Sequence, residues 1–184
     1  MSIPNLLAVI RLILTPITMA LILVSPDSTT IAIVATISFA VAAITDFADG
    51  YLARRWKITT TLGAFLDTVA DKILVSGALI ALVEIGRTSS WVAFIIIGRE
   101  VAIMGLRSVA ALDSGTVPAS MWGKWKATVQ FVAISIAILG LDLVVGPWRI
   151  DQWFMGAAVI VTLISAGDYF SRFRSVLSPR DRPD

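Results

Sequence analysis

Long runs of apolar residues, separated by short polar stretches, are the feature that most constrains what this chain can fold into. The runs cover residues 5–24, 30–44, 62–83, 91–112, 127–145 and 153–170. A helix needs about 20 apolar residues to cross a bilayer, so 184 residues have room for about six spans and no separate soluble domain. The mean hydropathy of +0.87 supports this. The sequence predicts an all-α integral membrane protein with six transmembrane helices, forming one domain over residues 1–184.

The distribution of basic residues predicts how the helices are oriented. Polar stretches 25–29, 85–90 and 146–151 fall on one side of the predicted bundle and contain Arg87 and Arg149. The other side carries Arg54, Arg55, Lys57, Lys124, Lys126, Arg172, Arg174, Arg180 and Arg182. Because basic loops remain in the cytoplasm, we expect both termini on that side of the plasma membrane. Residues 171–184 are expected to form a basic juxtamembrane tail that binds anionic lipid.

The composition restricts the chemistry that the chain can perform. There is no cysteine and no histidine, so disulfides, thiolate nucleophiles, imidazole catalysis and zinc sites built on these residues are excluded. Carboxylates, hydroxyls, lysine, arginine or a hard cation must carry any reaction. The formal net charge of only +2 gives no reason to expect a nucleic-acid partner, and an anionic membrane surface accounts for it better.

Four aspartates stand where apolar helices should continue. Asp46 and Asp49 are three residues apart near the end of the second helix, and Asp67 and Asp71 are four apart near the start of the third. Each pair lies on one helix face, and the short connection makes the two helices antiparallel neighbours. Four converging carboxylates imply either that several are protonated or that cations bind there, and oxygen ligands alone favour Mg²⁺ or Mn²⁺, with Ca²⁺ also compatible. The alternative is that they cap helices or pair with Arg54, Arg55 and Lys72.

Small residues and one arginine lie between the two acidic pairs. Gly50 and Ala53 leave a helix face open beside the carboxylates, where a ligand can approach the backbone. Arg54 can neutralise a phosphate with its planar fork of donors. Together they indicate a phosphate anhydride bound across two metal ions. Taken singly, Gly50 could also be a helix-packing contact and Arg54 a residue of the positive cytoplasmic side.

This spacing resembles the signature of the CDP-alcohol phosphotransferase family. The eight matching positions read Asp46-x2-Asp49-Gly50-x2-Ala53-Arg54-x8-Gly63-x3-Asp67-x3-Asp71. Chance agreement at eight fixed positions is rare, which makes the resemblance specific. It implies a six-helix membrane enzyme that uses two divalent cations, Mg²⁺ or Mn²⁺, to exchange the CMP of a CDP-linked lipid for an alcohol. The family also implies a homodimer.

The resemblance assigns roles to individual positions. Asp46, Asp49 and Asp67 would bind the metals, and Asp71 would serve both as a ligand and as the general base. The CDP-lipid site would be formed by Asn5, Gly50, Arg54 and Thr60. An aspartate beside a cation is a weak base, yet it can accept the proton of an alcohol that is already positioned for in-line attack.

Further cations occur in or beside the apolar helices. Arg99 and Arg107 are about two turns apart in the fourth helix, and Lys124 and Lys126 precede the fifth. Since charges inside a membrane helix are costly, we expect these four residues to form a cationic pocket for a phosphorylated acceptor. The alternative is interhelical pairing, of Arg99 with neighbours of Glu100 and of Arg107 with Asp113 or Asp168.

Three segments resemble the phosphatidylglycerophosphate synthase branch of the family, which implies CDP-diacylglycerol and sn-glycerol 3-phosphate as substrates. They are residues 3–7, Gly98-Arg99-Glu100 with residues 106–107, and residues 123–127 with Gln130. A cardiolipin synthase or a phosphatidylinositol phosphate synthase is the alternative within the family. An ion or proton transporter is the alternative from another class, but it would need polar residues through both membrane halves, whereas these charges gather at one side.

Overall fold

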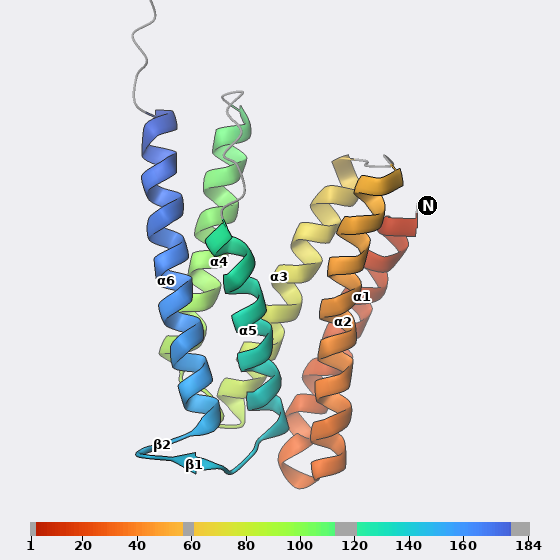
Figure 1. Ribbon diagram of the computed structural model, residues 1–184. Coiled ribbons are helices and arrows are strands. Elements are labelled where there is room, and N and C mark those ends of the chain that lie inside the picture. Colours follow the sequence, from red (N-terminus) through yellow and green to blue (C-terminus); the bar gives the residue numbers. More distant parts are fainter. Residues whose placement is uncertain (1–2, 57–60, 113–120, 178–184) are drawn as a thin grey trace, which may run out of the picture.

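The computed structural model describes residues 3–56, 61–112 and 121–177, and these form six long helices (Figure 1). The helices are α1 (Ile3–Val24), α2 (Thr29–Trp56), α3 (Thr61–Glu84), α4 (Ser90–Leu112), α5 (Met121–Leu139) and α6 (Ile150–Leu177). A 3-10 turn, η1 (Ser25–Asp27), joins α1 to α2, and a small hairpin of β1 (Val144–Val145) and β2 (Trp148–Arg149) precedes α6. The predicted all-α class is confirmed, with this hairpin as an addition.

Two segments within the described residues are long and apolar enough to cross a membrane by length and composition. They are Ala8–Asp27, mostly from α1, and Ile150–Phe173 from α6. Thr29–Thr45 and Trp125–Leu139 are apolar but shorter. Six transmembrane spans therefore remain a prediction, although six helices are present.

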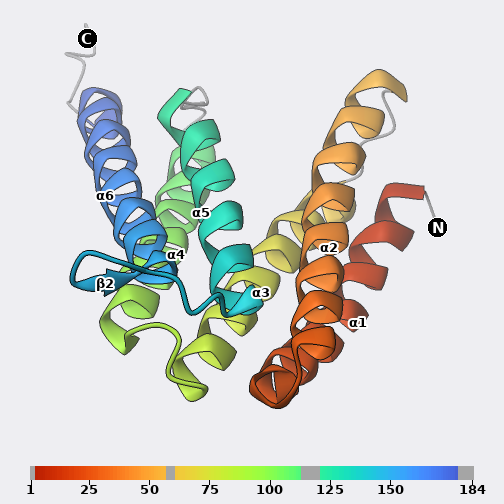
Figure 2. The same ribbon diagram turned by 60° about the horizontal axis from the view of Figure 1, so that its bottom comes forward.

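The helices run side by side, and the connections alternate between the two ends of the bundle. The η1 turn, the turn between α3 and α4, and the hairpin lie at one end, whereas the first and last described residues lie at the other (Figures 1 and 2). Helix α1 packs on α2 and α3, α5 packs on α6 and α2, and α4 packs on α6 and α3. The ends of α2, α4 and α6 and the beginnings of α3 and α5 are thereby brought to one end.

Small and branched apolar side chains fill the interior. Phe39 of α2 is fully buried and meets Phe131 of α5 with ring centroids 5.9 Å apart. Polar contacts also join neighbouring helices; for example, the hydroxyls of Thr18 and Ser38 are 2.7 Å apart, and Gln130 Nε2 donates to Thr162 Oγ1 at 3.1 Å. Large apolar residues are also exposed along the outside of the helices, including Ile13, Ile37, Phe94 and Ile160. Such an exterior suits a lipid surrounding better than water.

The predicted helix over residues 127–145 is wrong at its end, because α5 stops at Leu139. Gly140 follows with a φ of +62°, the left-handed conformation with which glycine commonly ends a helix. Arg87 Nη2 would lie 2.8 Å from a Cβ at this position. The chain then forms the hairpin, and Trp153 Nε1 donates to the Val145 carbonyl at 2.9 Å.

Two helices extend past the apolar runs that predicted them. Helix α2 continues from the run 30–44 to Trp56, and α6 continues from the run 153–170 to Leu177. A hydropathy pattern marks where apolar residues stop, whereas Asp, Arg and Tyr can all continue a helix at small cost. Residues 171–177 of the predicted tail are thus helical, and residues 178–184 lie outside the described part of the chain.

Candidate active site

The acidic pairs lie on two helices whose connected ends meet at one end of the bundle. Asp46 and Asp49 belong to the last turns of α2, and Asp67 and Asp71 to the first turns of α3. The helical spacing of each pair is confirmed by the backbone. Side-chain positions of Asp46, Asp49 and Asp67 lie outside what the structure describes, so the convergence of the four carboxylates stays a prediction.

The side-chain positions of several other predicted site residues are likewise not described. The side chains of Asn5, Arg54 and Lys124, the surroundings of Gly50 and all of Thr60 lie outside what the structure describes. No group of three or more possible metal-ligating side chains occurs among those that are described. The donors that the sequence predicts there, Asp46, Asp49, Asp67 and Asp71, are all carboxylates, a chemistry that fits Mg²⁺ or Mn²⁺.

Among the four aspartates of the signature, Asp71, the predicted general base, is the one whose side chain is described. Its carboxylate is partly buried, and its Oδ2 accepts a hydrogen bond from Lys72 Nζ at 2.6 Å. The same ammonium lies 2.8 Å from Glu100 Oε2 on α4. Lys72 therefore bridges the predicted general base and a second carboxylate on the neighbouring helix.

Glu100 is the centre of this charged cluster. Its side chain is only 5% exposed, and its Oε1 accepts hydrogen bonds from Lys126 Nζ of α5 and, at 3.3 Å, from Arg99 Nη1. Three cations from three helices thus surround one buried carboxylate. A buried carboxylate is tolerated when it is paired and hydrogen-bonded in this way.

The cluster continues toward α6 and encloses a small polar space. Arg99 Nη2 donates to Ser165 Oγ at 2.7 Å. A cavity of about 30 Å³ is lined by Asp71, Lys72, Val75, Glu100, Lys126, Ala127, Gln130 and Phe131. This volume suits about one water molecule, so the described part of the site is closely packed.

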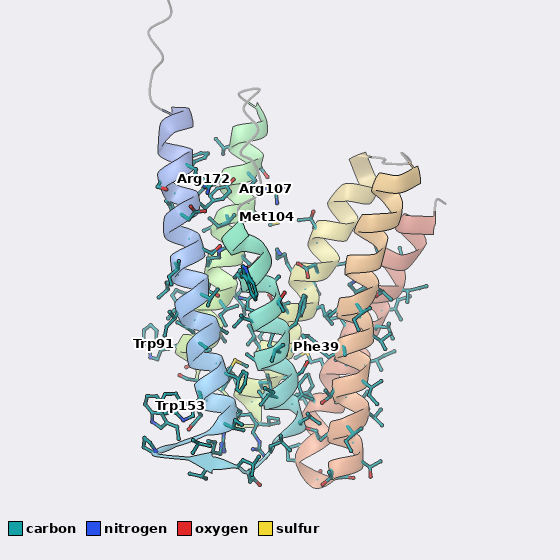
Figure 3. All side chains as sticks on the ribbon, viewed as in Figure 1. Phe39, Trp91, Met104, Arg107, Trp153 and Arg172 are labelled. Carbon is teal, nitrogen blue, oxygen red and sulfur yellow. The ribbon has the colours of Figure 1, made fainter. Side chains whose placement is uncertain are left out.

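The structure brings together only part of the predicted acceptor pocket. Arg99 and Lys126 join the cluster beside Asp71, whereas Arg107 is exposed two turns further along α4 (Figure 3). Among the described residues Arg99 pairs with Glu100 itself, and the carboxylate of Asp168 accepts from Arg172 Nε at 3.1 Å. Asp113, the other suggested partner of Arg107, lies outside the described residues.

Sequence reasoning did not place Glu100, Lys72 and Gln130 in the site. The signal for Glu100 was present, since it is the only acidic residue of α4. A lone carboxylate in an apolar helix is costly without partners. Lys72 had been considered only as a partner for an aspartate, and the structure shows that it contacts two carboxylates at once.

A larger apolar groove lies outside this cluster, between α1, α3 and α4. Its volume is about 490 Å³, and it is lined by Thr15, Pro16, Met19, Val69, Lys72, Ile73, Ser76, Gly77, Ile80, Val101 and Met104. Lys72 is its charged member and connects the groove with Asp71.

Comparison with known proteins shows which family the chain resembles. Residues 1–164 match the model of the CDP-alcohol phosphatidyltransferase family. The chain is 38% identical to the CDP-diacylglycerol--glycerol-3-phosphate 3-phosphatidyltransferase of Bacillus subtilis, over 93% of this chain and 94% of the relative. It is also 38% identical to a probable phosphatidylglycerophosphate synthase of Mycobacterium tuberculosis, over 93% and 81%. A Haemophilus influenzae protein with the same name as the Bacillus enzyme is 38% identical, over 90% and 85%.

The family match covers α1 to α5 and more than half of α6, including every position of the acidic signature. Two helices long and apolar enough to span a bilayer are consistent with this membrane-associated family. The chain therefore belongs to the CDP-alcohol phosphatidyltransferase family.

Proposed function

We propose that this chain transfers the phosphatidyl group of CDP-diacylglycerol to sn-glycerol 3-phosphate, giving phosphatidylglycerophosphate and CMP. The observation that carries the proposal is the likeness, over nearly the full length, to relatives named for this reaction. Within the chain, the complete acidic signature and the adjoining cations supply the residue types that the reaction needs.

In the reaction, the primary hydroxyl of the acceptor attacks the phosphorus that bears diacylglycerol. A P–O bond forms, the bond from that phosphorus to the oxygen of CMP breaks, and the electron pair leaves with CMP. Asp71 accepts the proton of the hydroxyl. Its hydrogen bond from Lys72 holds the carboxylate in one orientation, which favours a positioned proton transfer.

Asp46, Asp49, Asp67 and Asp71 would hold two Mg²⁺ or Mn²⁺ ions. Bound there, such ions supply neutralisation of the diphosphate and of the charge on the entering and leaving oxygens. Asn5, Gly50, Arg54 and Thr60 would bind the CDP portion. Arg54 supports this role by the planar donors of its guanidinium.

The acceptor's phosphate would be bound by Arg99, Arg107, Lys124 and Lys126. Arg99 and Lys126 support this assignment because both contact Glu100 in the charged cluster that adjoins Asp71. Arg107, two turns further along α4, would act at the entrance, where an exposed cation attracts an anionic substrate.

An acceptor screen tests the proposal. Purified protein is supplied with CDP-diacylglycerol and Mg²⁺, and CMP release is followed with glycerol 3-phosphate, inositol phosphate or phosphatidylglycerol as the acceptor. We expect turnover with glycerol 3-phosphate alone. Turnover only with inositol phosphate or only with phosphatidylglycerol would assign a different acceptor within the family.

Removal of metal tests the two-cation part. Activity should vanish with excess chelator and return with Mg²⁺ or Mn²⁺, because the diphosphate and the aspartates repel one another without cations. Full turnover in metal-free buffer would contradict this mechanism.

The proposed setting is the plasma membrane, with six spans, both termini and the active site on the cytoplasmic side, and a homodimer as the assembly. The basic residues at the active-site end support this orientation.

The apolar groove between α1, α3 and α4 offers a surface that a second copy could cover. Light scattering corrected for detergent should give the mass of two chains, and a monomer mass would contradict the homodimer.

A further inference from the structure

Glu100 is a buried carboxylate that the mechanism above does not use, although it touches three of the residues that the mechanism needs. It contacts Lys72, which holds Asp71, and it contacts Lys126 and Arg99 of the acceptor site. Each cation reaches it from a different position: Lys72 from α3, Arg99 from its own helix and Lys126 from α5.

We propose that Glu100 is a positioning residue for the acceptor, holding Lys72 and Lys126, which both line the small cavity beside Asp71. This role rests on the proposed function, since it names how the acceptor site of that reaction is held together. Glu100 does not touch the reacting atoms in this account, and acts through the two lysines.

The geometry favours a role in which Glu100 acts through the two lysines. The two carboxylate oxygens have different partners, because Oε2 faces Lys72 whereas Oε1 faces Lys126 and Arg99. A lysine side chain is flexible, with a strongly hydrated charge, so a buried ammonium needs a fixed counter-charge to stay in one place. Glu100 fixes two such ammonium groups relative to each other, and thereby fixes Lys126, a proposed ligand of the acceptor's phosphate, relative to Lys72, which contacts Asp71.

Electrostatics adds a second reason. Lys72, Arg99 and Lys126 carry three positive charges in a largely buried space, and without Glu100 they would repel one another. With the carboxylates of Glu100 and Asp71 both counted, these three cations still leave one net positive charge, which can attract a phosphate dianion. Glu100 therefore permits the cations to lie together without cancelling their total charge.

Glu100→Gln tests the role, since glutamine keeps the size of the side chain and removes its charge. We expect the apparent KM for glycerol 3-phosphate to rise about 10- to 100-fold, the effect of losing charge-assisted hydrogen bonds. The KM for CDP-diacylglycerol should stay within about twofold of wild type, because its proposed binding residues lie elsewhere. Equal changes in both values, or an unchanged value for glycerol 3-phosphate, would overturn the proposal.

A second variant and a matched control keep the test decisive. Glu100→Asp retains the charge but is too short to reach both lysines, so a smaller and still selective rise in the acceptor KM is expected; a wild-type value would count against the proposal. Asp151→Asn is the control, because Asp151 is a fully buried carboxylate held by Arg149 and Arg87 at the other end of the bundle. It should lower thermal stability and leave the ratio of the two KM values unchanged.

Failure of the proposed function would look different. If wild-type protein did not use glycerol 3-phosphate but used another alcohol, the proposed acceptor would be wrong, and the same variants would be measured with the alcohol that is used. A selective change in that alcohol's KM would still support the positioning role, and the absence of one would overturn it.

Discussion

Asp71 shows how one side chain can belong both to the predicted metal site and to a described hydrogen-bond network. Its Oδ2 accepts from Lys72, which is itself held by Glu100. Asp71→Asn preserves the size of the side chain but cannot accept the hydroxyl proton and binds cations weakly. We expect kcat to fall by at least about 100-fold, the loss typical of removing a general base, while the protein still folds. Single-turnover CMP release measures this effect.

The control for Asp71→Asn is Asp142→Asn at the opposite end of the bundle. Asp142 is 81% exposed, and its ion pair with Arg87 lies near the surface. Exposed pairs of this kind contribute little, so CMP release should remain near the wild-type rate. If Asp71→Asn also retained the wild-type rate, the general base would have to be another residue.

At this scale the sequence predicted the acidic positions but not the network around them. Spacing within one helix is read directly from residue numbers, and so the assignment of two aspartates to each helix could be made in advance. The pairing of Glu100 with Lys72 and Lys126 joins residues 28 and 26 positions apart in the chain. Such a pairing depends on how three helices pack, which a single sequence does not contain.

Among the helices, the packing of α3 on α1 depends on a position without a side chain. Gly77 is buried in α3, and a Cβ built there would lie 3.3 Å from Thr15 Cγ2 and 3.9 Å from Met19 Sδ. Gly77→Leu would force the two helices apart. We expect a loss of about 1–3 kcal/mol in the free energy of unfolding, measured as a lower thermal midpoint in detergent.

Gly156 of α6 is the matched glycine for this test. It is exposed, and no atom lies within 4 Å of a Cβ built there. Gly156→Leu should leave the midpoint unchanged or raise it, since leucine forms helices better than glycine. Equal midpoints for the two variants would contradict the close α1–α3 contact.

The described residues form six long helices, an even number, and the first and last of these residues lie at the same end of the bundle (Figure 1). The predicted metal ligands lie toward that end, in the last turns of α2 and the first turns of α3. Within the described residues, two helical segments are long and apolar enough to be spans, one toward each end of the chain. A two-span topology and a six-span topology would therefore both place the termini on the same side of the membrane. The two topologies differ in the side of the membrane on which the connection between α2 and α3 lies.

Single cysteines can separate these topologies, because the chain has none of its own. With six spans, Asp27→Cys and Asp142→Cys should react with a membrane-impermeant maleimide in intact cells, whereas Thr59→Cys and Ser178→Cys should react only after permeabilisation. With two spans, Thr59→Cys would react from outside together with Asp27→Cys. That result would also place the acidic signature on the side opposite to the cytoplasmic termini, away from the glycerol 3-phosphate of the cytoplasm. The position of Thr59 thus decides both the number of spans and whether the proposed acceptor can reach Asp71.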